Sequence, residues 1–278
     1  MQFKTLETKC RYFQSLSDYK LLPNAYVLVH IDGRSFSHLI KNKFQKPFDD
    51  DFINMMNETA KYVCANVQGA KLAYVQSDEI SIVLTDFDTP TTDAFFNNRL
   101  CKLQSIIASL ATSKFNQLML SYQFNKFSYD ADNFSIFSAN DVVNYINKSP
   151  LYQFDCKCWN VPTYNDVFCW FLYRNIDCTK NSKQQTAQTY LPHKELKCKT
   201  TDVQVDYLKE QKGIDWDSFE SYKKWGRFIY KTEIKHQNPN GEEYFRHCWG
   251  VFNGFDLSSE SGRNDFHNLN IIPKILEV

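Results

Sequence analysis

The sequence predicts an α+β fold in which an antiparallel sheet carries helices on one face. A strand-length apolar run at 26–32 comes first. Residues 52–67 then place apolar side chains at helical spacing. Two more apolar runs, 72–76 and 80–84, flank a short polar break and predict a hairpin. A second helical pattern follows, so the order strand, helix, hairpin, helix indicates a split β-α-β-β-α unit.

Residues 1–150 are predicted to form this unit. The segment 1–22 predicts a short helix, and Asp49 and Asp50 are typical caps for the first long helix. Its inward stripe comprises Phe52, Met55, Met56, Ala60, Val63, Cys64 and Val67. A loop at 89–93 leads into the second long helix. That helix is expected to bury Phe96, Leu100, Leu103, Ile106, Ile107, Leu110 and Ala111.

Two further strand-like pieces lie at 134–137 and 154–161. A helix over 164–189 follows, and its first apolar stripe comprises Val167, Phe168, Phe171, Leu172 and Ile176. The distal half of this helix is polar at 179–185. A helix half without an apolar stripe is expected to project away from the core or to contact a polar partner.

The last part of the chain predicts another hairpin, because 227–234 and 244–249 flank an Asn240-Gly241 turn signal. Residues 151–278 are therefore expected to complete the sheet and to add helices and a hairpin. No linker is visible, so the boundary near 150 stays open and the whole chain can also be one domain.

The bulk composition is that of a globular protein of 278 residues, 43% hydrophobic and 23% charged. The formal net charge of zero argues against a protein that coats nucleic acid along its whole surface, but it leaves room for a local basic patch. Nine cysteines without a Cys-x-x-Cys pair predict free thiols in a reducing compartment, the cytoplasm or the mitochondrial matrix. No run of apolar residues is long enough to span a bilayer.

Acidic residues stand at two predicted strand ends. Asp32 ends the first strand and is followed by Gly33, and Asp78-Glu79 occupies the tip of the first hairpin. Carboxylates at two strand ends can share two divalent cations, which align phosphates and stabilise an in-line displacement at phosphorus. Magnesium suits such oxygen ligands. The pattern therefore favours phosphoryl or nucleotidyl transfer, although Asp-Gly alone is a common turn and Asp78-Glu79 alone a common acidic hairpin tip.

Several segments, in order, carry a resemblance to one family. They are HIDGRSF at 30–36, KPFD at 46–49, QSDEIS at 76–81, RNIDCTKNSKQQTAQ at 174–188 and HKEL at 193–196, together with the basic pair Arg99 and Lys102. This set resembles the tRNA-His guanylyltransferase-like proteins, which extend RNA in the 3′-to-5′ direction. The segments span nearly the whole chain.

The resemblance implies a polymerase-palm-like domain with two Mg²⁺ ions. Asp32 and Asp78 would be the metal carboxylates, the Gly33 carbonyl a backbone ligand, and Glu79 a supporting catalytic group. Lys46 would help to activate the RNA 5′ end with ATP or GTP. The nucleoside triphosphate would contact Asp32, Gly33, Arg34, Ser35, Phe36, Ser37, Lys46, Ser77, Asp78, Arg99 and Lys102.

Two departures from the family pattern concern nucleotide preference. His30 occupies a position where arginine is common in the family, and Ser37 one where many members have histidine. Because that histidine helps in base contacts, the resemblance leaves the base preference at this site open.

The segments at 174–188 and 193–196 resemble the bacterial-type branch of the family. The tRNA-His enzymes carry a His-Ile-Asn-Asn-Leu-Tyr-Asn block there, and this chain does not. The resemblance thus favours templated repair of 5′-truncated tRNA, with addition of G at the −1 position of tRNA-His as the alternative. Lys180, Asn181, His193 and Lys194 would contact tRNA phosphates. Family members tend to be tetramers.

Two other functions stay open at this level. A palm domain can also make cyclic nucleotides, and incubation with a nucleoside triphosphate alone would reveal the cyclic product. The chain could instead be a non-catalytic tRNA-binding protein that kept the fold. The intact acidic residues Asp32, Asp78 and Glu79 argue against that reading.

Overall fold

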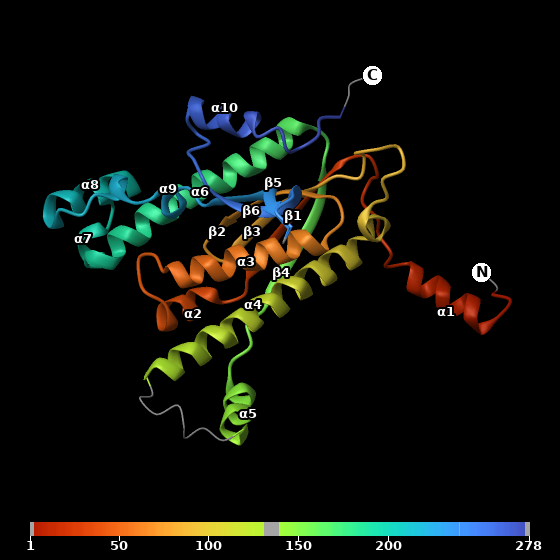
Figure 1. Cartoon of the computed structure of the whole chain (residues 1–278), viewed down its shortest axis with the longest axis horizontal. Helices are drawn as coiled ribbons and strands as arrows, with labels where there is room; N and C mark the ends of the chain where they lie inside the picture. Colours follow the sequence, from red (N-terminus) through yellow and green to blue (C-terminus); the bar gives the residue numbers. More distant parts are fainter. Residues whose placement is uncertain (1–2, 131–138, 239, 276–278) are drawn as a thin grey trace.

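The computed structural model describes residues 3–130, 139–238 and 240–275. Its centre is one six-stranded sheet in the order β4-β1-β3-β2-β5-β6, with antiparallel pairing throughout. The strands are β1 (Tyr26–Gly33), β2 (Ala70–Gln76), β3 (Glu79–Leu84), β4 (Phe154–Val161), β5 (Arg227–Gln237) and β6 (Glu243–Asn253). Helices flank this sheet (Figure 1). The predicted α+β class with an antiparallel sheet is confirmed.

The helices of the first half cover one face of the sheet. These are α3 (Asp50–Asn66) and α4 (Leu100–Asp130), and they pack against Val27, Val29 and Ile31 of β1. The Asp49 side chain accepts a hydrogen bond of 3.0 Å from the Phe52 amide, as expected of a helix cap. All seven residues of the predicted α3 stripe are buried.

The prediction for the start of the second long helix was wrong at Phe96. This residue lies in the short helix η1 (Phe95–Asn98), and its side chain is 43% exposed. Phe96, Asn97 and Asn98 all have positive φ, so the backbone leaves the helical path there, and α4 begins only at Leu100. Beyond that point Leu103, Ile107 and Ala111 are fully buried, as predicted.

C-terminal helices cover the opposite face. Tyr26 and Leu28 of β1 point to this side and pack against α6 (Tyr164–Tyr190) and α10 (Glu260–Asn268). Val167, Phe168 and Phe171 of α6 are buried here, whereas Ile176 is 50% exposed and its predicted inward orientation was wrong. The inward face of α6 continues through Arg174 and Cys178, so a residue midway between them points to solvent.

The polar distal half of α6 extends past the sheet (Figure 1). There α7 (His193–Leu196) and α8 (Thr201–Lys212) form a small lobe with its own core of Ala187, Leu191, Leu196 and Leu208. Small polar residues of α6 are buried against this lobe, and Trp216 of η3 (Trp216–Ser218) donates a hydrogen bond of 2.9 Å to Ser182.

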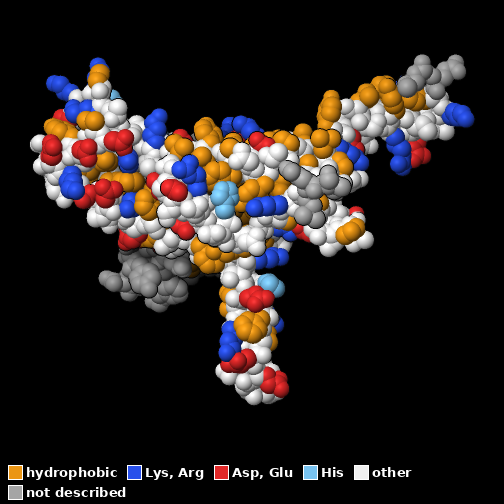
Figure 2. All heavy atoms as spheres, turned by 90° about the horizontal axis from the view of Figure 1, so that it is seen from above, with side chains coloured by type: hydrophobic (Ala, Val, Ile, Leu, Met, Phe, Trp, Pro, Cys, Tyr) orange, Lys and Arg blue, Asp and Glu red, His pale blue; other side chains and the backbone are white. Residues whose placement is uncertain are grey.

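Four further helices complete the described chain: α1 (Leu6–Ser15), α2 (Phe36–Lys43), α5 (Ala139–Lys148) and α9 (Ser221–Lys224). Figure 2 shows α1 standing clear of the body at one end with apolar side chains exposed, and acidic and basic side chains interspersed over the face in view. The strand predicted at 134–137 lies outside the described residues. Among the described helices, none has the length and apolar character that a bilayer crossing requires.

Candidate active site

The two acidic strand ends meet in space. Strands β1 and β3 pair so that Asp32 is opposite Glu79, and the Gly33 amide donates a hydrogen bond of 3.2 Å to the Asp78 carbonyl. On its other side, Asp32 is opposite Asp155 of β4. Antiparallel pairing therefore brings Asp32 and Asp78, which are 46 positions apart in the chain, to adjacent strand ends on the same side of the sheet. The predicted convergence of Asp32, Gly33, Asp78 and Glu79 is present.

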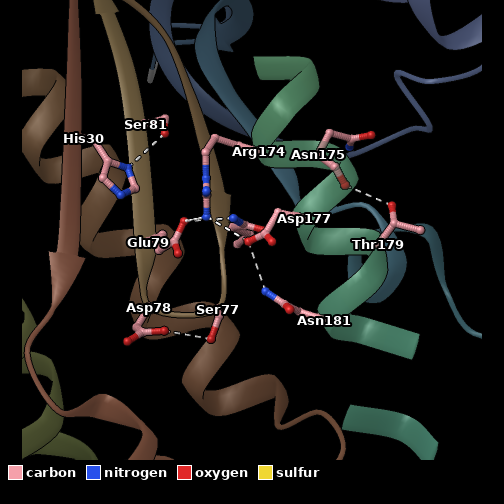
Figure 3. Close-up of polar contacts among 11 residues, drawn as sticks. His30, Ser77, Asp78, Glu79, Ser81, Arg174, Asn175, Asp177, Thr179 and Asn181 are labelled. Atoms are coloured by element: carbon pink, nitrogen blue, oxygen red, sulfur yellow. Dashed lines mark hydrogen bonds and ion pairs between the residues drawn. The ribbon is translucent and has the colours of Figure 1, made fainter. Parts of the chain in front are cut away.

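The turn between β2 and β3 sets the direction of Asp78. Ser77 has a φ of +43°, in the left-handed region that residues other than glycine seldom adopt. Its hydroxyl donates a hydrogen bond of 2.9 Å to Oδ1 of Asp78 (Figure 3). This bond holds the Asp78 side chain in one orientation at the end of the hairpin.

Gly33 is needed because the backbone is crowded at this point. A β-carbon here would lie 2.6 Å from the Phe36 ring and 3.0 Å from the β-carbon of Asp78. Phe36 is fully buried among Phe52, Phe115 and Phe154, so its ring cannot easily move. The glycine thus lets the Asp32 and Asp78 backbones approach each other.

The carboxylates are held in an unfavourable electrostatic environment. Burial raises the pKa of Asp78 to about 6, and the charges of Asp32 and Glu79 add to the shift, against the opposing hydrogen bond from Ser77. Burial also raises the pKa of Asp32, with further contributions from Glu79 and Asp155. A bound cation would remove both penalties, because it supplies the missing positive charge.

Glu79 has a different partner. Arg174 of α6 contacts Oε2 of Glu79 and also pairs with Asp177 at 3.0 Å (Figure 3). Gln76 donates a hydrogen bond of 2.8 Å to the same Glu79 oxygen. Arg174 is almost completely buried. Arg174 therefore offsets part of the charge of Glu79 within the protein.

The role of Arg174 was not predicted from the sequence. The available signal was a charged residue on the inward face of α6, between Phe171 and Cys178 at spacings of three and four. Charged residues are seldom buried without a partner, so an arginine at this position predicts an acidic partner on the sheet that α6 covers.

The residues present fit a hard divalent cation. Among the described residues, no three His, Cys, Asp or Glu side chains form a metal-binding group by themselves. Two carboxylates, Asp32 and Asp78, lie beside the Gly33 backbone. Magnesium characteristically uses one or two carboxylates and takes its other oxygens from water and substrate phosphates. The donor set agrees with a cation that is completed by the nucleotide.

Of the predicted nucleotide contacts at 34–37, Arg34 and Ser35 connect β1 to α2, and Phe36 and Ser37 begin α2. Arg34 is tied to Gln153 through its backbone amide at 2.9 Å and through its guanidinium at 3.0 Å. Ser35 precedes α2 with a φ of +61°. Since the Phe36 side chain belongs to the core, this residue can offer only its backbone to a ligand. Amides at a helix start favour phosphate oxygens.

A cavity of about 330 Å³ opens beside Ser77, Asp78 and Glu79. It lies between the segment that leads into α3, the inner face of distal α6, and α9. Gln45 and Pro47 line it, whereas the Lys46 side chain between them is exposed. The two sequence neighbours of Lys46 therefore line this cavity, whereas Lys46 itself is not among the lining residues.

The structure does not bring Arg99 and Lys102 to the acidic residues within one chain. Arg99 pairs with Asp18 at 2.7 Å, and both it and Lys102 lie at the start of α4, near the point where β1 begins. Asp32 is at the other end of β1, roughly 20 Å away at about 3.4 Å per residue. Their contact with the triphosphate stays a prediction.

The predicted tRNA contacts lie on the distal half of α6 and on the lobe beside it. Lys180 and Asn181 are on distal α6, and His193 and Lys194 are exposed on α7. Asn181 donates a hydrogen bond of 3.1 Å to Asp177 of the same helix (Figure 3), and it also lines the cavity beside Asp78.

The fold and the site define a class, the palm-like nucleotidyltransferases. In this class, carboxylates stand at the ends of neighbouring strands in an antiparallel sheet, and helices cover the sheet. Residues 7–162 match the family described as tRNAHis guanylyltransferase, which is more than half of the chain. The protein belongs to this family and is a guanylyltransferase-like nucleotidyltransferase.

Individual relatives agree with this assignment. The tRNA(His) guanylyltransferase of Candida glabrata is 28% identical over 246 residues, which are 84% of this chain and 94% of that protein. A bacterial tRNA(His) guanylyltransferase-like protein in complex with ATP is 30% identical with a TM-score of 0.77, covering 96% of this chain and 99% of that one. A complex of such a protein with GTP is 28% identical with a TM-score of 0.70 over the same shares of the two chains.

Proposed function

We propose that this protein adds nucleotides to the 5′ end of tRNA in the 3′-to-5′ direction and repairs tRNA that has lost nucleotides there. The observation that carries the proposal is the hydrogen bond of 3.2 Å from the Gly33 amide to the Asp78 carbonyl, which puts Asp78 beside the residue that follows Asp32. The similarity to bacterial proteins in complex with ATP and with GTP supports the two nucleotide roles. Repair is favoured over −1 guanylylation because the HINNLYN block is absent from the chain.

Two chemical steps are required. An RNA 5′-monophosphate first attacks the α-phosphorus of ATP or GTP, which gives a 5′-activated RNA and releases pyrophosphate. The 3′-hydroxyl of the incoming nucleotide then attacks the RNA 5′-phosphoryl group and displaces the nucleoside monophosphate. With a 5′-triphosphate RNA the first step is unnecessary, and pyrophosphate leaves in the second.

The protein's own groups would orient these reactants. Asp32 and Asp78, with the Gly33 carbonyl, would hold Mg²⁺, which supplies charge neutralisation at the reacting phosphorus and lowers the pKa of the attacking hydroxyl when bound. Ser77 fixes Asp78, and Arg174 keeps Glu79 from adding its full negative charge beside the phosphates. Lys46 would act on the 5′ end that is being activated.

The parts of the chain would divide this work. Residues 1–150 would carry the nucleotide chemistry, and residues 151–278 would complete the sheet and present the lobe of α7 and α8 to tRNA through Lys180, Asn181, His193 and Lys194. By resemblance the protein would act as a homo-oligomer, a tetramer in the family pattern.

The test is an assay of purified protein with tRNAs that lack one 5′ nucleotide, with intact tRNA-His as the comparison, and with each nucleoside triphosphate in turn. Addition that restores the missing pairing partner on several truncated tRNAs would support repair. Addition of G to tRNA-His alone, whatever the template, would replace the repair proposal with −1 guanylylation.

A further inference from the structure

Arg227 is a buried cation without an acidic partner. It begins β5, where it pairs with Val75 of β2 and Asn253 of β6. The residue is buried, with a relative exposure of 4%. Its Nε donates a hydrogen bond of 2.9 Å to Asn57. Its Nη2 is buried and has no acceptor, and within the described ranges no carboxylate pairs with it.

A guanidinium in this state is costly. Arginine stays protonated in proteins, so burial leaves a full positive charge, and the hydrogen bond that it donates among the described residues goes to the neutral amide of Asn57. A buried donor without an acceptor loses its hydration and gains nothing in return. Such an arrangement is expected where a ligand supplies the missing acceptor, and Arg227 lines the cavity beside Asp78.

The nearby lysine does not compete for the same role. Lys223 of α9 also lines the cavity, but it lies 3.2 Å from Glu220 and 3.7 Å from Asp50, so its charge is already balanced. Arg227 is thus the cavity cation that these ion pairs leave available.

The wall opposite the strand ends is neutral and polar. Asn181, Gln184, Gln185 and Gln188 of α6 line the cavity at spacings of three, one and three, which places them on one face of the helix. Amides both donate and accept hydrogen bonds, so they match the edges of bases and the hydroxyls of ribose. A guanidinium matches phosphate oxygens.

We propose that Arg227 anchors a phosphate-binding subsite in this cavity, and that its occupant is a phosphoryl group of a nucleotide whose base or ribose lies along the amide face of α6. The inference rests on the proposed function, because nucleotide chemistry at Asp78 makes phosphate the anion at hand. The phosphate can belong to a free nucleoside triphosphate or to the 5′ end of RNA.

Equilibrium binding tests the subsite without turnover. In EDTA, so that no cation holds the phosphate, ATP and adenosine are titrated into the wild-type protein and into Arg227→Gln. ATP affinity is expected to fall roughly 10- to 100-fold, the usual range for loss of a charged hydrogen bond, while adenosine affinity stays the same. Arg246→Gln, which removes one exposed arginine from β6 of the same hairpin, is the matched control and should leave both affinities unchanged.

RNA arms separate the two sources of phosphate. A truncated tRNA is compared with 5′-phosphate and with 5′-hydroxyl ends. Loss of ATP affinity alone assigns the subsite to the free nucleotide, and loss of the preference for 5′-phosphate alone assigns it to RNA. If Arg227→Gln matches the wild-type protein in both arms, the subsite does not exist.

A second variant covers the case in which Arg227→Gln fails to fold, as judged by circular dichroism. Asn57→Asp keeps Arg227 but gives its guanidinium an internal carboxylate, so phosphate affinity should fall in the same assays; unchanged affinity overturns the proposal. The binding result is also independent of catalysis. A protein that adds no nucleotide to tRNA but shows these losses refutes the proposed function and leaves the subsite in place.

Discussion

Asp78→Asn offers the sharpest test of the acidic site, because it removes a charge and keeps the shape of the side chain. The amide oxygen of asparagine can still accept the hydrogen bond from Ser77, so the turn is expected to keep its geometry. In the absence of metal, the variant should be more stable than the wild-type protein at neutral pH.

The magnitude follows from the shift in pKa. Folding raises the pKa of Asp78 from 3.8 to about 6, so the folded protein retains a proton that the unfolded chain releases between these values. Stability therefore falls as the pH rises through this window, and the full penalty, about 3 kcal/mol, is present above pH 6. Asparagine has no proton to lose, so the variant escapes this penalty.

The assay is urea unfolding in EDTA at pH 4 and at pH 7. The advantage of Asp78→Asn should approach 3 kcal/mol at pH 7 and become small at pH 4, where the folded wild-type protein holds its proton. Asp206→Asn, an exposed change on α8, is the matched control and should show no such difference. Nucleotide addition by Asp78→Asn should be abolished at both pH values.

Two results would refute this reasoning. If the variant were less stable than the wild-type protein at pH 7, Asp78 would not lie in a site that strains its charge. If it added nucleotides normally with Mg²⁺ present, Asp78 would not be a metal ligand, whatever its effect on stability.

Three further predictions concern neighbouring residues. Arg174→Gln should cost about 3 kcal/mol, because it leaves Glu79 without its buried countercharge, and Glu79→Gln in the same chain should recover part of this loss in urea unfolding; no recovery would show that the pair is not coupled. Gly33→Ala should cost about 1–3 kcal/mol, since its β-carbon would meet the Phe36 ring at 2.6 Å, and an unchanged unfolding midpoint would contradict the crowding argument. Lys46→Ala should reduce addition to 5′-monophosphate RNA more than addition to 5′-triphosphate RNA, and equal losses would remove Lys46 from the activation step.

Local patterns were sufficient for most of the elements. The stripe that begins at Phe52 and the cap at Asp49 predicted α3, because helix periodicity and capping depend on residues close in sequence. The wrong prediction for Phe96 shows where helix periodicity is not sufficient. An apolar residue at helical spacing looked like a buried one, but three successive residues with positive φ take the chain out of the helix before Leu100.

The candidate site divides in the same way. Asp32, Gly33 and Asp78 could be identified because acidic residues at strand ends, and the motifs around them, are visible in the linear sequence. Arg174 and Arg227 could not be assigned roles, since their importance depends on burial and on which groups they contact: a carboxylate of β3 for one, and only an amide of α3 for the other. Charge balance in a buried site is a property of the assembled sheet and helices.

The sequence by itself determined the α+β class, the order of the elements, the family resemblance and the acidic residues of the site, because all of these are written in periodicity and in short motifs. Only the tertiary structure decided that α6 and α10 cover the second face, that Arg99 and Lys102 lie at the far end of β1 from Asp32, and that a buried arginine lines the cavity beside Asp78. The physical reason is that strand pairing and packing join residues remote in the chain, and the energy of a charge depends on the neighbours that this joining provides.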